Sequence, residues 1–137
     1  MAINKIELKR VTKSDIDFLY ELLSERTSIE SISHKKLPTK KQHVKFVNSN
    51  PYSKWYIIKL NNAKIGSVYL TQINEIGISI IKKFESQNIR QLILLKLFEK
   101  NPQERYLANI NPKNKDLKLF FKKNGFKLIQ YTYELSK

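Results

Sequence analysis

The stretch Glu75–Lys100, EIGISIIKKFESQNIRQLILLKLFEK, decides the fold. Its first part, Glu75–Ile81, is short and almost wholly apolar, which is typical of a strand buried on both faces. After Ser86 the apolar residues recur at helical spacing as far as about Lys100. A second short apolar run, Tyr106–Ile110, follows the helix. This order predicts a β-α-β crossover that joins two parallel strands.

Two β-rich runs precede this unit and predict a hairpin. They are Trp55–Leu60 and Lys64–Gln72, and they are joined at Asn61-Asn62. Asparagine tolerates the left-handed backbone that a tight hairpin turn needs. The sheet is therefore expected to contain antiparallel pairs before the parallel crossover.

The N-terminal third predicts a strand and two helices. The strand covers Ile6–Val11, and the first helix runs from Ser14 to about Arg26 with apolar residues at helical spacing. Thr39 is placed to cap the second helix, which must end before Pro51.

The C-terminal part predicts one more helix and a final strand. The helix begins at Asn114 and stops at Gly125, a typical helix-terminating residue. Phe126–Leu135 then alternates as a strand does, although only one long strand or two very short ones fit there. The fold class is therefore α/β (α+β), one domain over residues 1–137 with a mixed sheet and helices on both faces.

Composition narrows the chemistry. The 137 residues carry a formal net charge of +14 and no Cys, and His34 and His43 are the only histidines. This set assembles neither a zinc site nor a thiol nucleophile. No apolar run is long enough for a signal peptide or a membrane span, so a cytoplasmic protein without a membrane partner is expected.

The positive charge points to anionic ligands such as nucleotides or phosphorylated cofactors. Of the 26 cationic side chains 22 are Lys, however, and arginine is the preferred residue for reading bases and phosphates. A nucleic-acid-binding domain is therefore the least favoured hypothesis, because no zinc-finger, helix-turn-helix or RNA-binding signature accompanies the charge.

Three short motifs carry a resemblance to a known family. They are Ala63–Val68 with Gly66, Glu75–Ile80 with Gly77, and the helix from Asn114 that ends in Gly125-Phe126. In their order and spacing the chain resembles the GCN5-related N-acetyltransferases (GNAT), which move an acetyl group from acetyl-CoA to an amine. The resemblance implies a GNAT-like fold with a shortened C-terminal strand region, and acetyl-CoA as co-substrate.

The family's phosphate-binding loop is degenerate in this chain. It usually reads Arg or Gln, two residues, Gly, one residue, then Gly or Ala, whereas Glu85–Arg90 has no glycine. Asn88 tolerates the required turn, and Arg90 supplies charge where close backbone approach is lost. Lys82, Lys83 and Lys96 add positive charge near this helix for the phosphates of coenzyme A.

The resemblance implies the site residues one by one. The strand is expected to hold the pantetheine arm, the helix start to face the pyrophosphate, and the last helix to approach the thioester. The implied cofactor-binding residues are Ile78, Ser79, Ile80, Gln87, Asn88, Ile89, Arg90, Gln91, Asn114 and Phe121. Phe121 stands where many members carry the tyrosine that protonates the departing thiolate.

Candidate catalytic residues follow from the proton transfers that the reaction needs. Glu75, at the start of its strand, is the preferred general base, with His43 and His34 as alternatives. Tyr131 is a candidate general acid, and Tyr106, Tyr133 or water are the alternatives.

The acceptor is expected to be a small-molecule amine. The segment Leu37–Phe46 with Trp55-Tyr56 is similar to members that acetylate amino sugars on nucleotide carriers, and also to members that acetylate protein N-termini. One hypothesis is that a partner subunit completes the acceptor cleft in a homodimer. The competing hypothesis is a non-catalytic binding protein of the same fold, which the glycine-free loop and Phe121 favour.

Overall fold

The computed structural model describes residues 5–25 and 36–137. Within them the chain forms one five-stranded sheet in the order β1-β2-β3-β4-β5. The strands are β1 (Ile6–Arg10), β2 (Lys54–Leu60), β3 (Ala63–Leu70), β4 (Glu75–Ile80) and β5 (Leu107–Ala108). Neighbouring strands are antiparallel except β4 and β5, which are parallel. The predicted mixed sheet and β-α-β crossover are confirmed.

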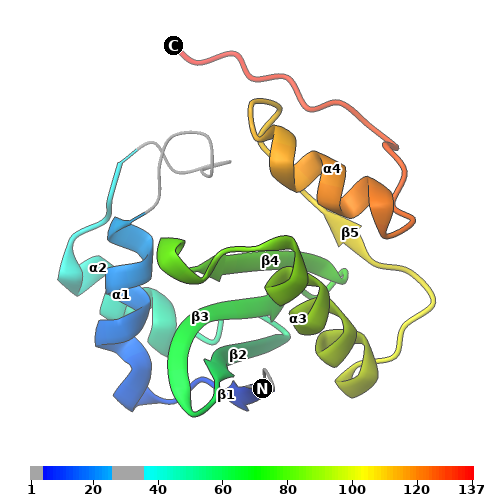
Figure 1. The fold of residues 1–137 in the computed structure, drawn as a ribbon. Coiled ribbons are helices and arrows are strands. Elements are labelled where there is room, and N and C mark those ends of the chain that lie inside the picture. Colours follow the sequence, from blue (N-terminus) through cyan, green and yellow to red (C-terminus); the bar gives the residue numbers. More distant parts are fainter. Residues whose placement is uncertain (1–4, 26–35) are drawn as a thin grey trace.

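Helices cover both faces of this sheet, as predicted (Figure 1). They are α1 (Ile16–Ser24), α2 (Lys40–Asn48), α3 (Gln87–Lys100) and α4 (Lys115–Lys123), with short 3-10 turns at Lys13–Asp15 and Lys82–Phe84. None of the helices in the described part of the chain combines the length and the apolar character that a bilayer span requires.

Alternation along β2 divides the core in two. Ile57 points to one face, where it packs with Leu19 and Leu22 of α1 and with Val47 of α2. Ile58, which is fully buried, points to the other face and joins the larger cluster that includes the inner side of α3 and residues of α4. Because successive strand residues face opposite ways, one strand anchors both helical layers.

Local signals in the sequence fix several element ends. The Thr39 hydroxyl accepts the amide proton of Gln42 at 3.2 Å and caps α2. Asn61 and Asn62 adopt positive φ angles of 49° and 72° in the hairpin turn. Gly125 follows α4 with φ 89°, a backbone conformation that side chains with a Cβ rarely adopt.

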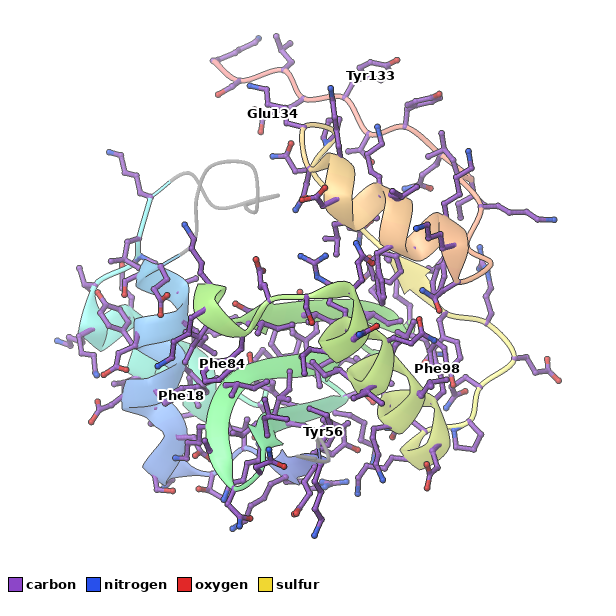
Figure 2. The ribbon with its side chains drawn as sticks, in the orientation of Figure 1. Phe18, Tyr56, Phe84, Phe98, Tyr133 and Glu134 are labelled. Carbon is purple, nitrogen blue, oxygen red and sulfur yellow. The ribbon has the colours of Figure 1, made fainter. Side chains whose placement is uncertain are left out.

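The predicted C-terminal strand is wrong. Phe126–Leu135 forms no strand, and Tyr133 is 91% exposed. Figure 2 shows Tyr133 and Glu134 on a C-terminal segment that runs away from the sheet. A strand needs an edge to pair with, and β5 offers an edge of only two residues instead of the predicted Tyr106–Ile110. Alternating sequence alone therefore does not make this segment a strand.

Two glycines allow close approach inside the sheet. A Cβ at Gly66 of β3 would lie 2.2 Å from the backbone oxygen of Ser79 on β4. A Cβ at Gly77 of β4 would lie 2.0 Å from the ring of Tyr69, which itself stacks on Tyr52 at 3.7 Å. The first clash involves backbone, and the second involves a side chain.

We predict that Gly66→Ala lowers the free energy of unfolding by about 1–3 kcal/mol, because the β4 backbone must shift. Gly77→Ala is expected to be partly rescued by Tyr69→Leu, which removes the clashing ring. The same Tyr69→Leu change serves as the matched control in the Gly66→Ala background, where it should rescue nothing. Urea unfolding of both double-mutant cycles measures this; equal coupling in the two cycles would contradict it.

Candidate functional site

Strands β4 and β5 separate after two residue pairs. Glu75 lies opposite Leu107 and Ile76 lies opposite Ala108, and the parallel ladder ends there. The next part of β4, residues 78–80, still pairs with β3 on its other side. Backbone groups of β4 that face away from β3 are thereby released from sheet pairing, and a narrow cleft opens beside them.

The cleft brings together parts of three elements. Its lining residues are Ile78, Ser79 and Ile80 of β4, Glu85 and Arg90 at the start of α3, and Asn114 and Leu117 at the start of α4. Five of the ten predicted cofactor residues are among them, namely Ile78, Ser79, Ile80, Arg90 and Asn114. Its volume is about 40 Å³, which is small beside the roughly 300–1,000 Å³ typical of a small-molecule pocket.

Charge in the cleft comes from one ion pair. The guanidinium of Arg90 lies 3.7 Å from the carboxylate of Glu85, and the Arg90 side chain is only 12% exposed. The hydroxyl of Ser86 caps α3 by accepting the amide proton of Ile89 at 3.1 Å. The positive end of the α3 dipole therefore lies beside this ion pair.

The other five predicted cofactor residues do not line the cleft. Gln87 and Asn88 are exposed in the first turn of α3, and Gln91 is half-buried. Ile89 is 6% exposed and faces the core. Phe121 is buried in the core, where its ring packs against Phe120 and Phe126.

Glu75 is held at the start of the short ladder between β4 and β5. Thr71 donates its hydroxyl proton to one carboxylate oxygen at 3.1 Å, and the Asn109 side-chain amide donates to the other at 2.6 Å. Asn109 directly follows β5, so the Glu75 carboxylate joins β4 to the end of β5. Glu75 and Ile78 are about 10 Å apart along β4, at 3.3 Å per residue.

His43 lies away from the cleft, between α1 and α2. It is 4% exposed, its Nε2 lies 3.3 Å from the Ile16 carbonyl oxygen, and its ring packs against Tyr20. Burial lowers the pKa of His43 below its usual value, and nearby Lys40 lowers it further, while the contact with Ile16 opposes the shift. The imidazole is therefore placed to support helix packing. His34 lies outside the described residues.

The candidate acids are spread over the C-terminal third. Tyr131 and Tyr133 are 75% and 91% exposed on the C-terminal segment, with ring centres 6.5 Å apart. The Tyr106 hydroxyl donates to the Asn101 carbonyl, accepts the Gln103 amide proton at 2.9 Å, and its ring stacks on Phe98. Tyr106 thus fixes the connection from α3 to β5, and Figure 2 labels its stacking partner Phe98 on α3.

Two features of the site were not predicted from sequence. Asn109 has no motif around it, and only the strand pairing brings it to Glu75. Glu85 lines the cleft beside Arg90, which follows it by five residues in the chain. The (i, i+5) spacing of these opposite charges across a helix start is the signal that could have indicated the pair.

The fold matches solved structures, several of which are described as acetyltransferases. A domain from Methanocaldococcus jannaschii superposes with a TM-score of 0.77 at 25% identity over 96% of this chain and 94% of that one. RimL, a ribosomal L7/L12 alpha-N-protein acetyltransferase in complex with coenzyme A, superposes with a TM-score of 0.73 at 19% identity, over 91% of this chain and 81% of RimL. A predicted acetyltransferase with acetyl-CoA from Clostridium acetobutylicum superposes with a TM-score of 0.69 at 15% identity over 96% of each chain.

No protein-family model and no curated protein matches the sequence. The structural agreement nevertheless extends over nearly the whole chain. The chain has the α/β fold of the GNAT acetyltransferases.

We predict that His43→Gln makes stability less sensitive to mild acid. Because the folded-state pKa of His43 is lowered, the neutral ring contributes stability above the unfolded-state pKa of about 6.5, and that stability is lost as pH falls below it. The drop in the urea midpoint from pH 7.5 to pH 5.5 should be larger in the wild type than in the variant. Equal losses in both proteins would show that His43 is not the titrating group.

Proposed function

We propose that this protein is an acetyl-CoA-dependent N-acetyltransferase that transfers the acetyl group directly to a primary amine. The observation that carries the proposal is the separation of β4 from β5 beside five of the residues implied for cofactor binding. The fold it shares with RimL, whose structure contains coenzyme A, supports the same conclusion.

The cleft residues fit coenzyme A chemically, with one exception. Backbone groups of residues 78–80 that β5 leaves unpaired are suited to the amides of a pantetheine arm. Arg90 is suited to a phosphate, and Lys82 and Lys83 precede the same helix. The exception is Glu85, an anion in the region where the phosphates of the cofactor would bind.

Bound acetyl-CoA supplies an acetyl thioester. The chain's own contribution is to orient the acceptor and to remove its proton, since an ammonium group is not a nucleophile. We assign proton removal to Glu75, whose carboxylate is oriented by Thr71 and Asn109. With no cysteine in the chain, a cysteine-bound acyl intermediate is excluded.

His43 and Tyr131 are left out of the proposed site. The first is occupied in helix packing and the second is exposed on the C-terminal segment. Departure of the thiolate therefore needs no protein acid in this proposal, because a thiol with pKa near 8.5 is an adequate leaving group.

The acceptor class is proposed at the level of a primary amine. RimL acts on the N-terminal amine of a ribosomal protein, which supports a protein N-terminus, and the similarity of Leu37–Phe46 to amino-sugar acetyltransferases supports a nucleotide-linked amino sugar. Turnover with a panel containing an N-terminal peptide and a nucleotide-linked amino sugar separates the two. If neither compound is acetylated, both acceptor assignments are refuted.

A homodimer is also proposed. The C-terminal segment exposes a set of large apolar side chains that a second copy would cover, namely Leu128, Ile129, Tyr131, Tyr133 and Leu135. Large apolar side chains that are exposed together on one segment favour association with a partner. Sedimentation at micromolar concentration is expected to give a dimer; a monomer would refute this part.

Calorimetric titration of acetyl-CoA into the protein tests the function itself. Heat of binding below millimolar ligand, followed by acetylation of an amine, is the expected result. Absence of binding at millimolar ligand overturns the proposal. Tight binding without turnover of any amine would instead support the non-catalytic binding protein that the glycine-free loop suggests.

We predict that Glu75→Gln lowers kcat by about 10²- to 10⁴-fold, the usual effect of losing a general base. The loss should shrink as pH rises, because more of the amine is then already deprotonated. The Kd for acetyl-CoA should change by less than about twofold, since Glu75 lies at the other end of β4 from the phosphate end of the cleft.

The matched control is Glu104→Gln, which removes one carboxylate charge at an exposed position before β5. Its kcat should equal that of the wild type. A Glu75→Gln enzyme with unchanged kcat, or with a loss that does not depend on pH, would remove Glu75 from the mechanism.

A further inference from the structure

The ion pair between Glu85 and Arg90 occupies the cleft that the proposed function assigns to the cofactor. Both residues line the cleft, and their charged atoms are 3.7 Å apart. Arg90 is 12% exposed and Glu85 is 35% exposed, so the guanidinium is the more buried partner. A ligand phosphate that binds Arg90 therefore competes with Glu85 for the guanidinium.

The position of Glu85 makes it a substitute for a bound anion. It directly precedes Ser86, the N-cap of α3, where the helix dipole favours negative charge. The Ser86 hydroxyl accepts the amide proton of Ile89. The backbone N–H groups of Gln87 and Asn88, in the first turn, have no acceptor within the helix. The Glu85 carboxylate is thus held near the charges and donors that a pyrophosphate would use.

The pair is also weak enough to exchange. At 3.7 Å it is longer than the 2.7–2.9 Å of a strong charge-assisted hydrogen bond, and Glu85 is partly solvated. Glu85 is moreover the one acidic side chain among the described cleft-lining residues. A phosphate group that carries more charge and offers two oxygens to the guanidinium competes well against it.

We infer that Glu85 is a displaceable counter-ion for the cofactor phosphates: it holds Arg90 in the free protein, and the pyrophosphate of coenzyme A replaces it on binding. This inference rests on the proposed function. Its consequence is that Glu85 weakens the binding of coenzyme A relative to what Arg90 alone would give.

Calorimetric titration of coenzyme A into the full-length chain tests the inference without turnover. Glu85→Gln is expected to bind coenzyme A about threefold to fivefold more tightly than the wild type, the upper part of the effect that one partly exposed charge contact produces. Glu104→Gln removes the same charge outside the cleft and should stay within about twofold of the wild type. Glu85→Ala should behave as Glu85→Gln does, which covers the case in which one variant folds poorly.

The Arg90→Gln background separates a specific exchange from a general charge effect. Arg90→Gln alone should weaken binding, and adding Glu85→Gln to it should give less than half of the gain seen in the wild-type background. An equal gain in both backgrounds, or a gain equal to that of Glu104→Gln, overturns the inference.

The inference and the proposed function fail differently. If the wild type binds coenzyme A and Glu85→Gln binds no more tightly, the inference is overturned and the function stands. If only the Glu85 variants bind, Glu85 blocks the cleft and is not displaced, so both the inference and the proposed function of the wild type are overturned. If no variant binds at millimolar ligand, both are overturned.

Discussion

The site depends on the place where β4 and β5 stop pairing. Two residue pairs hold the strands together, and the side chains of Glu75 and Asn109 join them beside that short ladder. Beyond it, β4 keeps its hydrogen bonds to β3 on one side and loses a partner on the other. Backbone N–H and C=O groups that lack a strand partner are available to pair with the amides of a bound ligand.

The rest of the structure keeps this separation in place. The inner side of α3 packs into the main core through Ile93 and Leu97, which fixes the helix start beside β4. Phe120 and Phe121 anchor α4 in the same core and bring Asn114 to the opposite wall of the cleft. The cleft is therefore a consequence of how the two helices pack, and its charge is set by Arg90 and Glu85.

Sequence patterns predicted most of the elements because each had a local cause. Thr39 caps α2 and Asn61-Asn62 turns the hairpin through interactions within a few residues. The final strand over Phe126–Leu135 failed because pairing is a long-range property that alternation does not encode. In the cleft, the β4 lining residues were expected from the family resemblance. The contact between Asn109 and Glu75 spans 34 residues and follows only from the fold.

Amide hydrogen exchange with and without coenzyme A tests the central claim most directly, because it reports on the backbone of β4 itself. Slower exchange confined to residues 78–80 and to the first turn of α3 is the result this account predicts. Protection elsewhere, for example along the lysine-rich surface, with none in β4, would contradict it.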